Sequence, residues 1–488
     1  MRQCTALPDG ARGADGRDPL AGAVVVGGAV RDAHLGVVAR DVDWLVADPA
    51  AAARALAEAA SHAAAGGASA VNLDAGRGHW RVVWHGDSDA PGTADTPTDA
   101  DVPSDPDAAV PAGADARRVW DLAPPEPPGD PSDPAVLAAD LGRRDVTINA
   151  LAFLPDRERF VDPHGGLADL RRGLVRAVAR ENLWADPLRA WRVVRFAAQL
   201  GFRVERRTYG ALQELAADLA AGRVALPAAE RIGAELDDLI ATPVAGRAFA
   251  ALDDLGLLDL ALPELTAGRG VAQGNLHHLD VLHHQLEALQ QLVDAFPDAG
   301  LAVRWATLLH DVGKPPTREP GTVLEDGLVL RDRFHGHDRL GAELAATALR
   351  RLRRPRERVA RVHDLVAAHM RPLPNDTRAA QRFAHRLRPL LPDLLRLMLA
   401  DREAARGRAA SAAARRRYRE RVGLVLAALE EPPPVAPLLD GHALMAELGI
   451  EPGPRVGEVL AAIAEARALG DVRTREEALA YARRLQRG

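Results

Sequence analysis

The pattern of hydrophobic and polar positions changes near residue 173. Before it, the apolar run Ala23–Val26 and the alternating stretch Trp80–Trp84 are typical of β-strands, and an alanine-rich segment at 50–65 is typical of a helix. From Gly173 onward, apolar residues recur at spacings of three and four, which indicates helices almost throughout. The pattern therefore predicts an α/β domain at the amino end and an all-α remainder.

Shifts in composition predict where the parts of the chain begin and end. Between about residues 87 and 135 the chain is rich in Asp, Pro, Ala and Thr, so we expect a disordered insertion, interrupted by a strand at Arg118–Leu122. A triple proline, Pro432–Pro434, precedes the last helical segment. The expected parts are a disordered tail at 1–20, an α/β head at 21–172, a helical neck at 173–265, a helical domain at 266–410 and a C-terminal helical module at 411–488.

A glycine pair and two aspartates carry the first candidate chemistry. Gly27 and Gly28 follow a predicted strand, and a turn of this kind allows backbone N–H groups to approach a phosphate chain. Asp41 and Asp43 are two residues apart on the next predicted strand, so both carboxylates point to the same side. Such a pair is suited to hold Mg²⁺ against the phosphates of a nucleotide. The alternative is a glycine turn followed by two solvated aspartates.

A series of motifs resembles those of a known family. The motifs are Gly27–Asp32 (GGAVRD), Asp41–Asp43 (DVD), Arg143–Ala150 (RRDVTINA), Asp162–Leu170 (DPHGGLADL), Asp186–Arg189 (DPLR) and Glu230–Leu236 (ERIGAEL). They resemble motifs of the tRNA nucleotidyltransferase/poly(A) polymerase family of the polymerase-β superfamily. Two positions depart from the family pattern, because Val146 replaces an aromatic residue and Ala185 replaces the glutamate that precedes Asp186.

The resemblance implies roles for residues of these motifs. Asp41 and Asp43 are implied to hold Mg²⁺ for catalysis, with Asp121 on a neighbouring strand as a third carboxylate; otherwise Asp121 is an edge-strand residue facing water. The implied nucleotide-binding residues are Gly27, Gly28, Arg31, Asp32, Arg144, Asp145, Asn149, Asp186, Arg189 and Arg192. Asp186 and Arg189 are implied to hydrogen-bond the Watson–Crick edge of CTP or ATP, and the neck is implied to bind nucleotide and RNA.

A second set of candidate residues lies in the predicted helical part. Histidines cluster at His277–His284, and the string Leu308–Lys314 (LLHDVGK) resembles the signature of the HD phosphohydrolase superfamily. The resemblance implies that His284, His310, Asp311 and Asp401 bind a divalent transition metal, with His337 and His369 as contacts for a second metal or a phosphate. A lone histidine on an apolar helix is more often a hydrogen-bonded core residue. Whether this domain is a phosphohydrolase or a structural scaffold stays open.

Composition restricts the partners and the compartment. The net charge of the 488 residues is −6, so RNA contact requires local arginine clusters such as Arg350–Arg354 and Arg415–Arg421. One cysteine, Cys4, excludes an internal disulfide framework and suits a reducing cytoplasm. No apolar run is long enough to span a membrane, and the amino end lacks a signal-peptide pattern. We therefore expect a cytoplasmic protein that contacts no membrane, and no obligate protein partner is evident.

These features together predict the function. The resemblance implies a class II tRNA nucleotidyltransferase with a polymerase-β-like head and all-α neck, HD and tail domains, which adds CCA, or part of it, to the tRNA 3′ end from CTP and ATP. Within this class, CC-adding, A-adding and poly(A) polymerase activities compete, and Gly78–Val83 resembles lineages that split CC- and A-addition. Two alternatives of other classes are an HD metal-dependent phosphohydrolase whose head only binds nucleotide or RNA, and an RNA-binding protein without catalysis.

Overall fold

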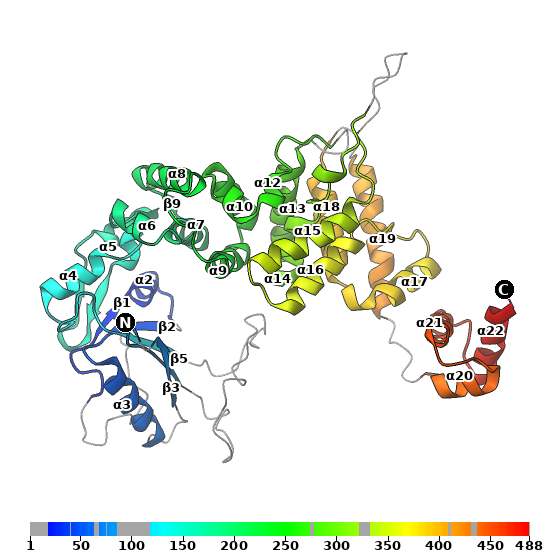
Figure 1. Ribbon diagram of the computed structural model, residues 1–488, viewed down its shortest axis with the longest axis horizontal. Coiled ribbons are helices and arrows are strands. Elements are labelled where there is room, and N and C mark those ends of the chain that lie inside the picture. The colour runs from blue at the N-terminus through cyan, green and yellow to red at the C-terminus, as the bar shows by residue number, and fades with distance from the viewer. Residues whose placement is uncertain are drawn as a thin grey trace. The chain divides into compact units, whose positions relative to one another are not determined.

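The computed structural model describes residues 18–39, 41–62, 68–74, 76–84, 118–273, 278–321, 332–407, 411–430 and 437–487 (Figure 1). The chain divides into two compact units, one of residues 1–239 with 254–260 and one of residues 240–253 with 261–488. Apart from residues 18–20, the predicted tail lies outside the described residues, as does the predicted insertion before residue 118. None of the helices in the described ranges has the length and apolar character needed to cross a membrane.

A seven-stranded mixed sheet forms the centre of the head, in the strand order β3-β4-β5-β2-β1-β6-β7 (Figure 1). The strands are β1 (Val24–Val26), β2 (Asp41–Leu45), β3 (Ala68–Asp74), β4 (His79–Trp84), β5 (Arg118–Ala123), β6 (Ala152–Leu154) and β7 (Arg159–Val161). Strand β2 is antiparallel to β1 and parallel to β5, which places Asp43 between Val26 and Asp121. The predicted α/β head is therefore confirmed.

Alternation along β2 sets the direction of its two aspartates. Val42 and Trp44 are buried on one face, where the Trp44 ring lies 5.8 Å from that of Trp120. Helix α3 (Pro49–His62) packs on β3, β4 and β5 and buries Leu56. Because side chains alternate along a strand, burial of Trp44 directs Asp41 and Asp43 to the opposite face.

The other face of the sheet is covered in part by helix α4 (Pro134–Gly142). Leu137 and Leu141 of this helix pack against Val24 and Val26 of β1. The side chain of Asp133 caps α4 by accepting hydrogen bonds from two backbone N–H groups of its first turn. The predicted insertion is thus too long at its carboxyl end, because residues 118–135 contain the whole of β5 and the start of a capped helix.

Helices follow the head almost without interruption. The first of them are α5 (Gly166–Arg172), α6 (Arg180–Ala185), α7 (Arg189–Leu200), α8 (Arg206–Ala220) and α9 (Ala229–Ile240), with the short parallel pair β8 (Leu174–Val175) and β9 (Arg203–Val204). The following helices are α10 (Ala245–Asp254), α11 (Leu257–Ala261), α12 (Pro263–Thr266), α13 (Val281–Ala295), α14 (Leu301–Leu309), α15 (His337–Arg351), α16 (Arg356–Ala368), α17 (Thr377–Leu387), α18 (Asp393–Ala404) and α19 (Ala412–Glu430). The predicted helical remainder is confirmed.

The last three helices have a hydrophobic cluster of their own. They are α20 (Gly441–Leu448), α21 (Pro454–Ala468) and α22 (Arg475–Arg487). Leu444, Val459, Ile463 and Ala482 are buried in this cluster. The spacing of Val459, Ile463 and Ala466 on one side of α21 is the helical periodicity that the sequence shows there.

Candidate active sites

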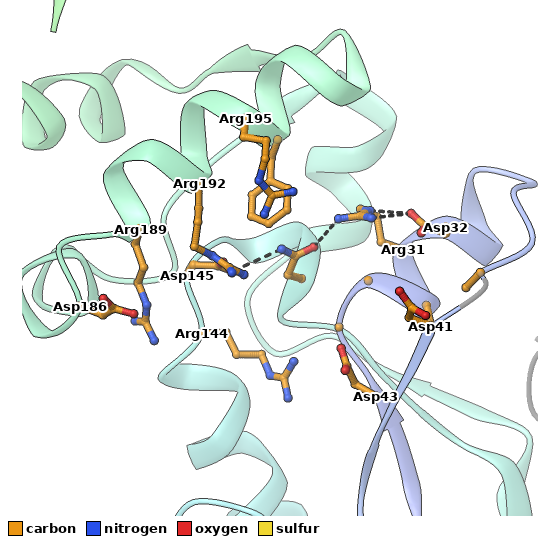
Figure 2. Close-up of a pocket in the computed structure, with 16 residues that line it drawn as sticks. Arg31, Asp32, Asp41, Asp43, Arg144, Asp145, Asp186, Arg189, Arg192 and Arg195 are labelled. Carbon is orange, nitrogen blue, oxygen red and sulfur yellow. Dashed lines mark hydrogen bonds and ion pairs between the residues drawn. The ribbon is translucent and has the colours of Figure 1, made fainter. Parts of the chain in front are cut away.

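A cavity of about 560 Å³, called the head cavity below, is lined by the head and by residues 186–196 of the same compact unit, and charged side chains from several elements point into it (Figure 2). The predicted residues that line it are Gly27, Gly28, Arg31, Asp32, Asp41, Asp43, Arg144, Asp145, Asn149, Asp186, Arg189 and Arg192. Arg195 and Phe196 line it as well. The fold therefore brings together residues as far apart in the chain as Gly27 and Phe196, and of the predicted catalytic and nucleotide-binding residues Asp121 alone is not in this lining.

Gly27 makes the close packing at the floor of the cavity possible. Its φ is 75°, and a Cβ atom there would lie 3.0 Å from a terminal nitrogen of Arg144 and 3.2 Å from Oδ2 of Asp43. The N–H of Gly27 donates to the carbonyl of Leu151, so this amide is already engaged. The first-turn amides of helix α2 (Gly28–His34) have no partner within the helix, which leaves Gly28 and Ala29 as the amides available to an anion.

The carboxylates of β2 form a crowded acidic group. Burial raises the pKa of Asp43; Arg144 opposes this shift, and the carboxylates of Asp121 and Asp41 add to it. Carboxylates held this close repel one another, and a divalent cation between them relieves the repulsion. Asp41 and Asp43 thus offer hard oxygen donors of the kind that Mg²⁺ takes, and the residues fit such an ion.

Asp121 lies where the sequence places it, but it has a protein partner. It is opposite Asp43 across the parallel pair β2–β5. Both of its oxygens accept hydrogen bonds of 2.8 Å from Arg81 on β4, in a bidentate ion pair. Arg81 is a residue that sequence reasoning missed, because its partner is 40 positions away and becomes a neighbour only through strand pairing.

A chain of charged hydrogen bonds crosses the cavity (Figure 2). Arg31 pairs with Asp32 and donates at 2.8 Å to Oδ1 of Asn149. Asn149 donates at 3.3 Å to Asp145, whose other oxygen accepts from Arg192 at 2.8 Å. Burial alone would raise the pKa of Asp145, but the charge and hydrogen bond of Arg192 together with the hydrogen bonds from Val146 and Asn149 outweigh it and lower the pKa. The predicted nucleotide-binding residues Asp145 and Asn149 therefore bond one another in this structure.

Helix α7 supplies a basic face to the cavity. Arg189, Arg192 and Arg195 are spaced by three residues, and the guanidinium groups of Arg192 and Arg195 lie 5.3 Å and 4.4 Å from the ring centroid of Phe196. Arg31 lies 5.7 Å from the same ring. Phe196 was not among the predicted residues, although its position one after Arg195 was visible in the sequence.

Helix α9 holds two of these cavity groups in place. Arg231 is paired with Asp186 at 3.0 Å, and Glu235 is paired with Arg195 at 2.6 Å. Both residues belong to the ERIGAEL motif, to which the sequence alone assigned no role. The motif therefore connects α9 to Asp186, which is one of the two predicted base-contacting residues, and to Arg195 of α7.

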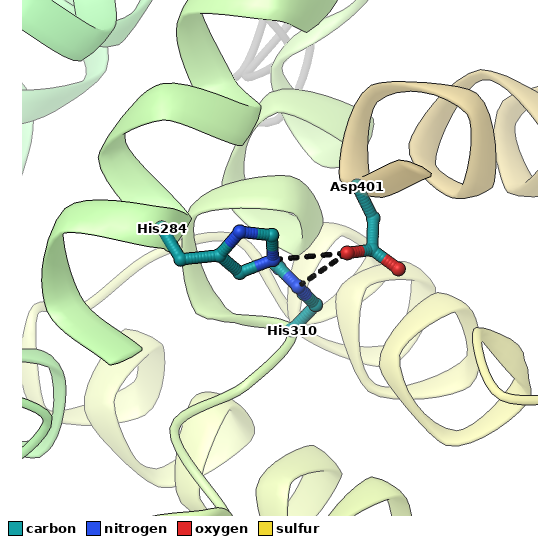
Figure 3. Close-up of side chains that lie close together, drawn as sticks. All are labelled: His284, His310 and Asp401. Carbon is teal, nitrogen blue, oxygen red and sulfur yellow. Dashed lines mark hydrogen bonds and ion pairs between the residues drawn. The ribbon is translucent and has the colours of Figure 1, made fainter. Parts of the chain in front are cut away.

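A second candidate site lies in the other unit (Figure 3). His284 of α13 and Asp401 of α18 point toward each other, with Nε2 of His284 2.9 Å from Oδ1 of Asp401. His310, at the end of α14, places its Nε2 3.7 Å from the same oxygen. One ligand atom from each of the three residues lies within 4.8 Å of the others, which is close enough for one metal ion.

Asp311, His337 and His369 form an adjacent group with the same spacing. Oδ2 of Asp311 lies 3.2 Å from Nε2 of His310, and Oδ1 lies 3.5 Å from Nε2 of His337. Asp311 therefore stands between the two groups, with one oxygen toward each. The six predicted metal-site residues are thus brought together, in two adjacent groups of three. Of the histidines nearby in the sequence, His277 lies outside the described residues.

The tautomers of these histidines fit metal binding. Nδ1 of His310, His337 and His369 lies within 2.6–2.8 Å of a backbone carbonyl oxygen, so it donates there and Nε2 is the nitrogen left to bind a metal. The three Nε2 atoms are buried and make no hydrogen bond in the described structure. Burial would lower the pKa of His310, but Asp311 and Asp401 raise it to about 10, so without a metal His310 also carries a proton on Nε2, which a bound cation would displace. A set of buried imidazoles between carboxylates suits a divalent metal better than an apolar core.

Comparison with known proteins identifies the family. Residues 117–176 match the Poly A polymerase head domain, 201–268 the probable RNA and SrmB-binding site of polymerase A, and 281–406 the HD domain. An A-adding tRNA nucleotidyltransferase of Deinococcus radiodurans is 50% identical over 466 residues, 95% of each chain. The chain belongs to the tRNA nucleotidyltransferase/poly(A) polymerase family.

Other members of the tRNA nucleotidyltransferase/poly(A) polymerase family support the same assignment. A CC-adding tRNA nucleotidyltransferase of Thermus thermophilus is 40% identical over 93% of this chain and 92% of its own. The CCA-adding enzyme of Bacillus stearothermophilus in complex with CTP shares the fold, with a TM-score of 0.59 at 21% identity over 95% of this chain and 93% of its own. The predicted family, fold class and enzyme class are confirmed, and the protein is a nucleotidyltransferase.

Proposed function

We propose that the protein adds the terminal adenosine to tRNA, using ATP, in the head cavity. The observation that carries this proposal is the 50% identity along 95% of both chains to an enzyme named for A-addition, against 40% to one named for CC-addition. CCA addition, CC addition and poly(A) synthesis are the alternatives within the family. We further propose a cytoplasmic location, with tRNA and ATP as partners.

The residues of the head cavity have different roles in the proposed reaction. Gly28 and Ala29 offer amides, and Arg31 and Arg144 offer guanidinium groups, to the triphosphate. A Mg²⁺ ion held by Asp41 and Asp43 would supply charge neutralisation at the phosphates and acidify the 3′-hydroxyl of the RNA. Asp186 and Arg189 face the base, where a carboxylate accepts from the exocyclic amine and a guanidinium donates to ring nitrogen. Most of the rate enhancement then comes from positioning and charge stabilisation.

An incorporation assay tests the proposal. Purified protein is given tRNA transcripts that lack all of CCA, or only the final A, with CTP and ATP singly and together. We expect one adenosine on the transcript that ends in CC and no incorporation of cytidine. Asp41→Ala should abolish this addition. Addition of cytidine to the shorter transcript, or a run of adenosines, would overturn A-addition in favour of one of the family alternatives.

A second function is favoured by a specific observation in the HD domain, namely two adjacent groups of three ligands around buried, unbonded Nε2 atoms. We propose that this centre hydrolyses phosphate esters. The oxygen of a water molecule bonds to phosphorus, the ester P–O bond breaks, and the leaving oxygen takes a proton. Divalent metal ions bound by these ligands would lower the pKa of that water. A structural scaffold is the competing interpretation.

One variant in each candidate site tests whether the two activities belong to different sites. Asp41→Ala should lose nucleotide incorporation and keep hydrolysis of p-nitrophenyl phosphate. His310→Ala should lose hydrolysis and bound metal and keep incorporation. Wild-type protein that binds metal and hydrolyses no phosphate ester under any metal would support the scaffold interpretation instead.

A further inference from the structure

A cavity of about 350 Å³ lies directly on the HD centre. Its lining includes Asp311, His337, His369 and Asp401, which are ligand candidates in both groups. This volume is in the range of sites that hold small organic ligands, and it is larger than one phosphate group requires. A substrate whose phosphate reaches the ligand groups therefore has room for further atoms in the same cavity.

Three arginines from three different segments also line this cavity. Arg371 follows α16, Arg402 lies on α18, and Arg421 lies on α19. None of the three is in an ion pair with any residue that the structure describes. Nε of Arg402 is buried and makes no hydrogen bond within that same part of the chain, while its guanidinium group lies 5.9 Å from the ring of Tyr418. Arginines without acidic partners in a partly buried cavity favour an anionic ligand.

Other basic residues near these three arginines differ from them, because each is bound to an acidic partner. Arg419, two residues before Arg421 on α19, donates to Glu403 and lines a different cavity. Arg396 on α18 is paired with Asp298, 2.7 Å away. The single lysine of the lining, Lys314, is bound to Asp311 at 2.6 Å. The uncompensated positive charge of this cavity is thus supplied by Arg371, Arg402 and Arg421.

Part of this wall comes from outside the segment that matches the HD domain. The match ends at residue 406, whereas Tyr418 and Arg421 lie on α19 (Ala412–Glu430). Apolar side chains of Met370, Leu373 and Met398 also line the cavity. An element added after the HD domain therefore contributes both a cation and an aromatic side chain to the cavity over the centre.

We propose that Arg371, Arg402 and Arg421 form a second anion subsite, so that the HD centre takes phosphate esters that carry a second phosphate. The scissile phosphate occupies the side of the histidine and aspartate ligands, and the second phosphate occupies the arginine side. Two sources share this chemistry, a nucleoside bisphosphate and the 3′-phosphorylated end of an oligonucleotide. The proposal rests on the hydrolytic function proposed above.

Hydrolysis kinetics test the subsite on the full-length protein loaded with Mn²⁺. The substrates are p-nitrophenyl phosphate, adenosine 3′,5′-bisphosphate and a 3′-phosphorylated trinucleotide. In the double variant Arg402→Ala/Arg421→Ala, we expect KM to rise about tenfold or more for a two-phosphate substrate, with kcat changed little. KM for p-nitrophenyl phosphate should stay within about twofold, because it presents one phosphate. The matched control is Arg382→Ala, an exposed arginine of α17 that does not line the cavity.

Comparison of the three substrates identifies which molecule supplies the second phosphate. A binding measurement separates the anion subsite from the hydrolytic function. A rise in KM for the trinucleotide alone assigns the subsite to an oligonucleotide end, and a rise for both assigns it to a nucleotide. Calorimetric binding of adenosine 3′,5′-bisphosphate to metal-free protein gives a readout that needs no catalysis. Binding that the double variant loses supports the subsite even if nothing is hydrolysed, in which case the hydrolytic function alone fails. Equal effects on all three substrates, or unchanged binding and KM in the double variant, overturn the subsite.

Discussion

Single residues of the head cavity carry charges that are balanced within the protein. Asp145 is nearly inaccessible, and its ionised form is held by Arg192, the amide of Val146 and the side chain of Asn149. Its side chain is 6% exposed, against 36% for Arg192. When the pair is broken, the carboxylate is therefore the group left charged and shielded from water. A buried carboxylate without a cation costs more than the pair contributes.

Arg192→Gln should therefore lower the free energy of unfolding by about 2 kcal/mol at pH 7, less than for a fully buried pair because Arg192 is partly exposed. The pKa of Asp145 lies below its ordinary value of 3.8 in the wild type and should rise above it in the variant. As pH falls through that raised pKa, Asp145 of the variant takes up a proton and no longer carries an unpaired buried charge. The difference in free energy of unfolding between wild type and variant should therefore become smaller toward pH 4. Thermal unfolding between pH 4 and 8 measures this.

The control for that series is Arg223→Gln, which removes an exposed ion pair with Asp218. It should cost less than about 1 kcal/mol. A stability difference for Arg192→Gln that widens on acidification would contradict the assignment of Asp145 as the affected group.

Gly27→Ala tests the floor of the cavity. A side chain at φ 75° costs about 1 kcal/mol, and here its Cβ also crowds Arg144 and Asp43. We expect KM for ATP to rise about tenfold or more, since both crowded residues line the nucleotide cavity. Gly22→Ala is a matched control, because Gly22 has φ 76° and nothing within 4 Å of the added atom. Similar stability loss with KM changed only in Gly27→Ala would confirm the close packing; equal KM values would refute it.

At the scale of elements, the sequence predicted features that are set by residues close together in the chain. It missed side-chain pairs between residues that are far apart in the chain. The alternation of β2 predicts the shared direction of Asp41 and Asp43, because a strand alternates wherever it is placed. The bidentate pair of Arg81 with Asp121 and the pair of Arg231 with Asp186 join residues 40 and 45 positions apart. Such pairs depend on strand order and helix packing, which short-range periodicity does not encode.

Helix packing at the HD centre depends on the absence of a side chain at Gly313. A Cβ atom there would lie 2.1 Å from the carbonyl oxygen of His337 and 2.6 Å from the amide of Gly341, so Gly313 lets α15 approach the end of α14. Gly313→Ala must push α15 away and carry the candidate ligand His337 with it. We expect a loss of about 1–3 kcal/mol and a fall in bound metal measured by elemental analysis, with nucleotide incorporation retained.

Gly300→Ala is the matched control for this packing argument. Gly300 precedes the same helix, α14, and nothing lies within 4 Å of an added Cβ atom. Its metal content should equal that of the wild type. A Gly313→Ala protein with full metal content would show that the approach of α15 is not needed for the centre.

For the whole molecule, the two candidate sites lie in separate compact units, and each is complete within its own unit. The chain carries a net charge of −6, so its overall field does not attract RNA. Recognition of tRNA must then depend on local cations that are not neutralised by neighbouring acids. Within α19, Arg415 and Arg419 are near Glu403, whereas Arg416 and Arg417 are exposed.

Arg416→Gln/Arg417→Gln should therefore weaken tRNA binding several-fold and reduce the slope of log affinity against log salt by about 1 to 2, since each arginine that no longer neutralises a phosphate leaves roughly one counterion on the RNA. KM for ATP should not change, because neither residue lines the head cavity. Filter binding of a tRNA transcript at four salt concentrations measures the slope, with Arg382→Gln as a control on a different helix. An unchanged slope would show that α19 does not bind the RNA backbone, and would turn the search for the RNA-binding surface to Arg350–Arg354.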